Sequence, residues 1–435
     1  MKKIFQYIML AVVTIVMASC TSDIEETTAT TGKSNVQLVV GEFPAFGDSQ
    51  TRAIGTPDEG KTSWAEGDEL LLEMTSKTLG TKYAAFKYNG SSWELASGEL
   101  SYKEDEVPTF PHVYYAPNYK WEAGKLVLKE GKVEGTDEYI EGKANITPNG
   151  EGINVSFADA IRNYSRLRIA TMPNMPITVA FNNRYTPAGS SVNAFFPRYT
   201  LTSDEKGNAY LYGTFGQYCD FEVKYEGAPL ASHTFYQAAE NAKSYVLDAT
   251  VVSLTDEGIT YDQIVEDVKK ELDAGKTYIN LILAPDVDEE TLEAIHIGLQ
   301  EAKYWSINLT LIGCKKIPSG GFMYWKMLKS IALPDVTEIA EKAFLDCTRL
   351  QKVVLGNLTK VYGKAGEKGI FEGCRTKDID LILSKDQKVM NGGKTEGGYC
   401  WTADITKDYS GSDEHNGRVF LNYDFQSITC DYQVP

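Results

Sequence analysis

The feature that most restricts what this chain can fold into is a pattern of apolar residues that recurs every 22 positions in its C-terminal part. The pattern takes Leu309 to Ile331, Leu311 to Leu333, Ile317 to Ile339, Phe322 to Phe344 and Leu328 to Leu350. The same step continues to Val353, Leu355, Leu358 and Val361, and a further copy follows an insertion at 363–368. Such a period predicts stacked units with one continuous core, because no single unit can bury its apolar face alone. We expect residues 277–390 to form this stack.

The segment Ala343–Leu350 resembles the BspA-type leucine-rich repeat. The resemblance implies a short solenoid in which a phenylalanine and a cysteine of each coil fill the interior. Cys347 and Cys374 occupy equivalent positions in two copies, so we expect buried free thiols there rather than a disulfide. Trp325 holds the same position one copy earlier. The Gly-rich tail from Met390 onward is expected to cover the last coil.

The segment before the repeats predicts helices alternating with strands. Ile264, Val268 and Leu272 lie four residues apart, which indicates the buried face of a helix. A strand, a second helix capped by Asp288 and another strand are expected to follow. This order favours parallel strand pairing through a helical crossover. We therefore expect residues 251–435 to form one α/β domain of leucine-rich-repeat type with capping elements at its ends.

The preceding two hundred residues have the sequence pattern of an all-β structure. Apolar and polar residues alternate in Val36–Val40, and Asn89–Gly90 after another strand-like segment is a hairpin signal. Short strands with turn residues every eight to twelve positions are typical of β-sandwiches. Because the span exceeds the length of one such domain, we expect two sandwiches, at 36–158 and 159–250.

Motifs in this span also resemble those of the fimbrillin-like (Mfa-like) lipoproteins. The matching segments are Trp64–Leu70, Phe86–Trp93, Val155–Ala160 with Ser165–Ile169, and Asn241–Leu247. The resemblance implies two transthyretin-like β-sandwiches and a role in forming or capping cell-surface fimbriae. The expected fold is therefore mainly β with an α/β C-terminal part, in which two transthyretin-like β-sandwiches precede a short leucine-rich-repeat solenoid.

Residues 1–19 have the pattern of a lipoprotein signal peptide. Lys2 and Lys3 precede an apolar run too short to span a bilayer comfortably, and small residues stand directly before Cys20. This arrangement resembles the lipobox of bacterial lipoproteins, which implies lipidation of Cys20; an ordinary cleaved leader with an incidental cysteine is the alternative. Residues 20–35 are expected to form a polar tether.

The acidic segment Ser22–Glu26 resembles the surface-export signal of lipoproteins in the phylum that contains gut Bacteroides. The resemblance implies an outer-membrane protein that is lipid-anchored and exposed at the cell surface, with the periplasmic face as the alternative. No second apolar stretch of 18 residues occurs, so membrane contact is expected through the lipid anchor only.

Two further sites are candidates for covalent processing. Arg52 lies in a polar segment after the first predicted strand. The fimbrillin resemblance implies cleavage after an arginine in this loop, which would free the first strand's groove for another subunit's strand; a solvated surface charge is the alternative. Six cysteines remain after Cys20, and Cys400 with Cys430 is the best candidate pair for a disulfide, because an even count outside the cytoplasm permits pairing.

Charge and composition exclude several classes of function. A net charge of −17 without a basic run longer than two residues argues against nucleic acid as a partner. The chain has 4 histidines, no CxxC spacing and no Gly-x-Ser-x-Gly, His-Glu-x-x-His or P-loop motif. We therefore expect no catalytic residue, no cofactor and no metal. A cysteine paired with His415, or two carboxylates for glycoside hydrolysis, are enzyme alternatives that spacing alone leaves open.

The leading hypothesis is a non-catalytic cell-surface lipoprotein that acts as a fimbrial tip or accessory subunit, or as a cell-adhesion protein. Its expected partners are other fimbrial subunits, or host or bacterial surface proteins or glycans. The alternative is a glycan-capture lipoprotein for nutrient uptake. An exposed aromatic platform, built from clusters such as Tyr114–Trp121, Tyr304–Trp305 or Tyr324–Trp325, would favour that alternative.

Overall fold

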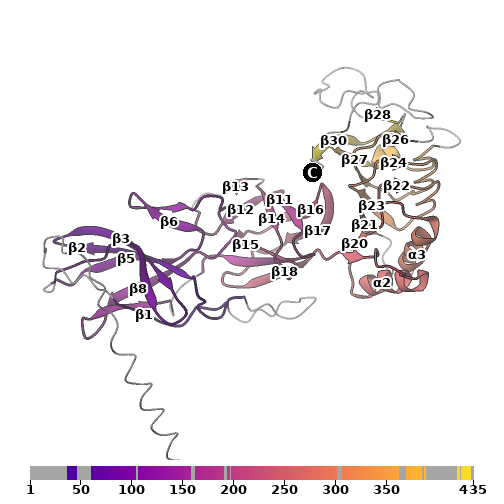
Figure 1. Ribbon diagram of the computed structural model, residues 1–435. Helices are drawn as coiled ribbons and strands as arrows, with labels where there is room; N and C mark the ends of the chain where they lie inside the picture. Colours follow the sequence, from indigo (N-terminus) through magenta and orange to yellow (C-terminus); the bar gives the residue numbers. More distant parts are fainter. Residues whose placement is uncertain are drawn as a thin grey trace, which may run out of the picture.

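Short strands separated by turns make up most of the fold. The residues that the computed structural model describes form mainly β structure and two α-helices. These residues are 37–46, 60–103, 106–157, 162–190, 194–195, 197–300, 306–361, 369–384, 387, 419–421 and 423–432. Figure 1 shows three β-rich parts that follow one another along the molecule, with β1 in the part at one end and the last parallel strands in the part at the other. The prediction of a mainly β chain is confirmed.

The first part is a seven-stranded sheet in the order β1-β9-β8-β5-β2-β3-β4. Its strands are β1 (Gln37–Val40), β2 (Glu69–Ser76), β3 (Gly80–Tyr88), β4 (Trp93–Gly98), β5 (Thr109–Tyr115), β8 (Ile140–Ile146) and β9 (Gly152–Ser156). The first half of β8 pairs with β5 and the second half with β9. The sheet therefore bends at β8, and its edge strands β1 and β4 contact each other. Leu70, Val113 and Ile153 pack in the core that this bend encloses.

Two hairpins in the first part follow from local sequence. A loop of residues 89–92 joins β3 to β4, with Tyr88 paired to Trp93, and Gly90 in this loop adopts a φ of 94° that favours glycine. The hairpin predicted at this point is confirmed. A second hairpin, β6 (Tyr119–Glu122) with β7 (Lys125–Leu128), packs against the other face of the sheet.

The second part consists of two sheets that share one core. Their strands are β10 (Ser165–Ala170), β11 (Pro176–Phe181), β12 (Arg184–Pro187), β13 (Ala194–Phe195), β14 (Arg198–Thr202), β15 (Asn208–Phe215), β16 (Cys219–Tyr225), β17 (Ala228–Phe235) and β18 (Ser244–Asp248). One sheet has the order β13-β12-β15-β10-β18 and the other β14-β11-β16-β17. Leu167 and Leu211 of the first sheet pack with Val179 and Phe221 of the second.

The first and last strands of each of these two parts pair in parallel. β1 pairs with β9 over four residues, with Leu38 opposite Ile153. β10 pairs with β18 over five residues, with Leu167 opposite Tyr245. The chain therefore enters each part on one strand and leaves it on that strand's parallel neighbour.

A buried ion pair joins the first part to the second. Glu138 and Arg162 are 5% and 4% exposed, and two hydrogen bonds of 3.1 and 3.2 Å join their side chains. The Tyr164 hydroxyl donates to the same carboxylate. Arg162 also donates to the carbonyl of Ala45, and its guanidinium lies 4.0 Å from the ring centre of Phe46. Charge, hydrogen bonds and ring contact therefore compensate for the loss of water around both groups.

The third part is built on a parallel sheet in the order β19-β20-β21-β23-β25-β27-β30. Its elements are β19 (Val252–Ser253), α2 (Tyr261–Asp273), β20 (Tyr278–Ile282), α3 (Glu289–Gln300), β21 (Ile307–Ile312), β22 (Lys316–Ile317), β23 (Leu328–Leu333), β24 (Glu338–Ile339), β25 (Lys352–Leu355), β26 (Lys360–Val361), the 3-10 turn η1 (Thr376–Asp378), β27 (Asp380–Ser384), β28 (Val419–Phe420), β29 (Tyr423–Asp424) and β30 (Ser427–Tyr432).

The helices and the parallel pairing predicted for this part are confirmed. Helix α2 buries Ile264, Val268 and Leu272. Helix α3 follows Asp288, whose carboxylate accepts a 2.8 Å hydrogen bond from the Thr291 amide. β20 and β21 pair in parallel across this helix.

The register of the sheet reproduces the 22-residue period of the sequence. Leu309 pairs with Ile331, which pairs with Val353, so each copy of the repeat lies beside the next. A smaller parallel sheet, β22-β24-β26, places Ile317, Ile339 and Val361 in register in the same way. Each of these three copies therefore contributes one strand to each of two parallel sheets.

One column of aromatic rings fills the interior of the third part. Phe322, Phe344 and Phe371 stack with centroid distances of 5.3 and 5.0 Å, and Phe344 is fully buried as predicted. Tyr423 and Phe425 pack edge-on against Phe371, so residues from the C-terminal end of the chain cover the last coil.

Candidate functional site

The described part of the structure does not bring together the site residues predicted from the sequence. Cys20, Arg52 and Cys400 lie outside the described residues. Cys430 belongs to β30, where its backbone pairs with that of Leu383. Lipidation of Cys20, cleavage at Arg52 and a disulfide between Cys400 and Cys430 therefore stay predictions.

The interior cysteines are held as thiols by burial and by backbone acceptors. Cys347 donates to the Phe322 carbonyl at 3.0 Å, and Cys374 donates to the Phe344 carbonyl at 2.9 Å. Both thiols are free; Cys347 is buried as expected, whereas Cys374 is only partly buried. At Cys314, burial raises the pKa of the thiol to about 11. Such thiols pack as small apolar groups and are poor nucleophiles.

Most of the aromatic residues singled out in the sequence lie in packed positions. Tyr115 and Tyr119 are buried, and Trp325 is buried with its ring stacked on His296 at 4.7 Å. Tyr324 is the exception, with 51% of its surface exposed. The pair Tyr304–Trp305 lies outside the described residues. The described residues of these clusters therefore give no aromatic platform of the kind that a sugar-stacking site would use.

Strand β17 of the second part lies against the parallel sheet of the third part. Ala228 packs among Ala332, Val354 and Ile382, one residue from each of β23, β25 and β27. These three residues face away from the coil interior, because their neighbours along each strand, such as Ile331, point into it. The outer face of the parallel sheet is thus covered by the chain's own preceding part.

Hydrogen bonds fix this contact. Thr310 donates to the Pro229 carbonyl and Asn280 donates to the Leu230 carbonyl, each at 2.9 Å. The Ser232 and Tyr278 hydroxyls form a further hydrogen bond of 2.9 Å. Backbone groups of β17 that would otherwise face solvent are therefore bound by side chains of the neighbouring sheet.

An ion pair also joins the second and third parts at this contact. Lys352 of β25 lies 3.1 Å from the carboxylate of Glu222 on β16. Burial opposes ionisation of Glu222, but Lys352 and Lys224 outweigh it and lower the pKa of this carboxyl. Stacked-repeat proteins commonly bind partners on their extended sheet face. Here that surface is already occupied.

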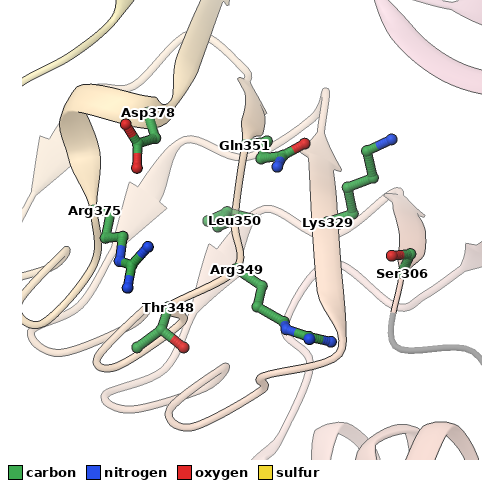
Figure 2. A pocket seen from close by; sticks show the side chains of 8 residues that line it. All are labelled: Ser306, Lys329, Thr348, Arg349, Leu350, Gln351, Arg375 and Asp378. Atoms are coloured by element: carbon green, nitrogen blue, oxygen red, sulfur yellow. The ribbon is translucent and has the colours of Figure 1, made fainter.

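Beside the covered face, a groove of about 560 Å³ opens at the ends of the strands. Figure 2 shows the side chains that line it, which come from the starts of β21, β23, β25 and β27 and the turns before them. The lining residues are Ser306, Lys329, Thr348, Arg349, Leu350, Gln351, Arg375 and Asp378. We refer to this cavity as the basic groove.

The local charge of the basic groove is positive, opposite in sign to the net charge of the chain. Lys329, Arg349 and Arg375 line it together with a single carboxylate, that of Asp378, in a protein of net charge −17. All three cationic side chains are exposed, and ion pairs between described residues involve neither Lys329 nor Arg375. The groove can therefore bind an anion through charge and hydrogen bonds, and its lining includes no histidine or cysteine for nucleophilic chemistry.

The residues of the basic groove could not be recognised from the sequence. They belong to no motif, and their charges stand apart in the sequence. The repeat period gives no signal for the row, because the position one period after Lys329 holds the neutral Gln351, which directly precedes β25. Arg349 and Arg375 stand at other repeat positions, so a search of that position would have found Lys329 alone.

The described residues were searched for a metal site and for a helix that could span a membrane. Among the described residues, no group of three or more His, Cys, Asp or Glu side chains is placed to hold a metal ion. None of the helices in the described ranges has both the length and the apolar character needed to cross a membrane.

Comparisons with known proteins do not assign this chain to a family. No protein-family model matches the chain, and no curated protein matches it. One solved structure is similar, described as a candidate cell adhesion protein from Bacteroides fragilis, with 11% sequence identity and a TM-score of 0.27. The similarity covers 52% of this chain and 94% of that one. A TM-score this low supports no conclusion about the fold or role of this chain.

Proposed function

We propose that this chain is a non-catalytic cell-surface lipoprotein of the adhesin type, anchored to the outer membrane through Cys20. In this proposal two fimbrillin-like, transthyretin-like sandwiches form a stalk, and a short leucine-rich-repeat solenoid forms the recognition domain. The order of the parts along the chain supports this arrangement, since the tether precedes β1 and the basic groove lies in the part at the other end of the molecule (Figure 1).

The observation that carries the proposal is the packing of β17 on the parallel sheet. Apolar contact at Ala228, two hydrogen bonds to β17 carbonyls and the Lys352–Glu222 ion pair hold the repeat part against its neighbour. A recognition domain held in this way keeps a fixed position at the end of the stalk. Such a construction suits attachment to a surface more than turnover of a substrate.

An attachment assay tests this role. Cells that display the chain should adhere to surfaces coated with host matrix proteins or mucin glycans, and cells that lack it should adhere several-fold less. Cells carrying Cys20→Ala provide the matched control, since they make the same chain without its anchor. Equal adhesion of displaying and lacking cells on every coating would overturn the proposal.

A role as fimbrial tip or accessory subunit is a second form of the same proposal, and the position of β1 favours it. β1 is an edge strand that pairs with β9 alone, and Leu38 inserts into the core while Val39 is 54% exposed. Removal of such a strand leaves an apolar groove and unpaired backbone groups, which another chain's strand can fill.

The alternative role, glycan capture for nutrient uptake, draws on the polar lining of the basic groove. Growth on a bound glycan as the carbon source separates the two roles. A deletion strain that grows normally but adheres poorly supports adhesion, and the reverse result supports nutrient capture.

Replacement of Cys20 tests the anchor. Cys20→Ala should shift the protein from the membrane fraction to the soluble fraction or leave it unprocessed, because acyl chains supply about 0.8 kcal/mol per buried CH₂ and no other anchor is expected. Fractionation followed by immunoblotting measures this. Membrane attachment of the variant at the wild-type level would contradict the lipoprotein assignment.

Cleavage at Arg52 tests strand exchange. An arginine-specific protease that cuts there leaves only non-covalent contacts between the anchored segment and the rest of the protein, among them the four residue pairs of β1 with β9 and the contacts of Ala45 and Phe46 with Arg162. The cut protein should leave the membrane and, with a donor strand from a pilin, form oligomers on size-exclusion chromatography. Arg52→Gln is the matched control. Protein that stays monomeric with every candidate pilin, and loses no stability after cleavage, would show that β1 is not exchangeable.

A further inference from the structure

We propose that the basic groove binds an acidic polysaccharide, a linear chain of sugars that carries carboxylate or sulfate groups. This inference rests on the proposed function and deepens it by naming the class of ligand. It starts from the charge of the groove, because three cationic side chains and one carboxylate line it. The whole protein has a net charge of −17, so most of its surface repels anions. The positive charge of the groove attracts anions instead and raises their local concentration there.

The cations are arranged in a row rather than in a cup. Figure 2 shows Arg375, Arg349 and Lys329 one after another across the ends of neighbouring strands. Arg375 and Arg349 lie in the turns before β27 and β25, and Lys329 lies in β23. These three strands are consecutive in the sheet, and adjacent strands lie about 4.8 Å apart. The outer two strands therefore lie about 10 Å apart. A linear ligand with repeated anionic groups fits this row better than a single small anion does.

The neutral side chains of the groove suit sugars. Thr348 and Gln351 offer a hydroxyl and an amide group between the cations, and Ser306 offers a hydroxyl beyond Lys329 (Figure 2); these groups can exchange hydrogen bonds with sugar hydroxyls. Leu350, the apolar lining residue, is 2% exposed and offers almost no apolar surface. Guanidinium groups bind carboxylate and sulfate oxygens through paired hydrogen bonds.

Two other polyanions fit the groove less well. An acidic peptide would gain affinity by adding a strand to a free sheet edge, but β23 and β25 are paired on both sides. Single-stranded nucleic acid gains affinity from bases stacked on aromatic rings, and the described residues that line the groove include no aromatic one. The position of the groove is also consistent with a ligand site, because β17 leaves the strand ends open while it covers the sheet face.

A direct binding experiment tests the inference. The full-length chain, purified in detergent, is titrated with heparin as a sulfated chain, polygalacturonate as a carboxylated chain, dextran as a neutral chain and polyglutamate as an acidic peptide. At least one acidic polysaccharide should bind with an affinity that falls as salt is added, and dextran should not bind. The double variant Lys329→Gln/Arg375→Gln should weaken this binding about tenfold or more.

The matched control is Lys316→Gln/Lys326→Gln, which removes the same charge from two exposed lysines of the third part that do not line the groove. It should bind within about twofold of the wild type, and all three proteins should melt at the same temperature. The inference is overturned if neither acidic polysaccharide binds the wild type, if both double variants lose affinity equally, or if polyglutamate binds as tightly as the polysaccharides. Loss of adhesion on deletion of the chain, without polysaccharide binding, would overturn this inference and leave the adhesin role standing. Polysaccharide binding by a chain that promotes no adhesion would do the reverse.

Discussion

Arg162→Ala should lower the free energy of unfolding by about 3–5 kcal/mol, because it leaves the Glu138 carboxylate buried without its cation. The remaining donor to that carboxylate is the Tyr164 hydroxyl, which cannot neutralise the charge. The change also removes the guanidinium from the Phe46 ring and from the Ala45 carbonyl. Chemical denaturation of the purified chain measures the loss, and the transition that it shifts should be that of the first and second parts.

Two variants make this prediction specific. Arg198→Ala removes an exposed arginine from β14 and should change stability by less than about 0.5 kcal/mol. Replacement of both partners, Glu138→Leu with Arg162→Met, should recover part of the loss, since an apolar pair of similar volume can take the place of a buried ion pair. If Arg162→Ala proves no more harmful than Arg198→Ala, the pair does not stabilise the junction.

Phe344→Ala should destabilise the third part by about 3–5 kcal/mol. Its ring lies fully buried between those of Phe322 and Phe371, so its removal leaves a cavity and breaks the aromatic column in the middle. Because each coil contacts its neighbours, the damage should spread through the repeats and spare the first two parts. Hydrogen exchange, read part by part, separates these regions.

Tyr324→Ala is the matched control for this change, since it removes a half-exposed ring from a nearby position. It should change stability far less than Phe344→Ala does. Phe344→Leu, which refills most of the volume, should restore a large share of the loss. If Phe344→Ala melts at the same temperature as the wild type, Phe344 does not fill the interior of the repeats, and the repeat register is wrong.

The repeat part was the most predictable region, because its period is written directly in the sequence. A residue at one repeat position pairs with its copy 22 residues later, as Leu309 does with Ile331, so one internal comparison gives both the strands and their register. Helix α2 was predictable for a similar reason, since its buried residues recur at the helical period.

Strand β17 could not be predicted by the same reasoning. Its sequence, Ala228–Phe235, begins with four buried residues and does not alternate, because one side faces the second part's core and the other faces the parallel sheet. A strand covered on both sides loses the two-residue period that marks a half-exposed strand. The partner that covers it lies about a hundred residues later in the sequence and cannot be inferred locally.

The basic groove could not be predicted, because its residues come together only when the repeats stack in the folded structure. In the sequence, Lys329 and Arg375 are 46 positions apart and look like ordinary surface charges. The sheet brings their strands to within one neighbour of each other. The candidate sites that sequence did suggest lie largely outside the described residues, at Cys20, Arg52 and Cys400.

The parallel pairing of first and last strands determines how the first and second parts respond to mechanical tension. In the first part the chain enters at the start of β1 and leaves at the end of β9, so a pull between its ends drags these neighbours along each other in opposite directions. β10 and β18 are loaded in the same way in the second part. All the hydrogen bonds between each pair then share the force, whereas a hairpin pulled from its open end breaks them one after another. Single-molecule pulling from the two ends of the chain should therefore show both parts resisting in shear, as a protein needs if it holds a cell to a surface under flow.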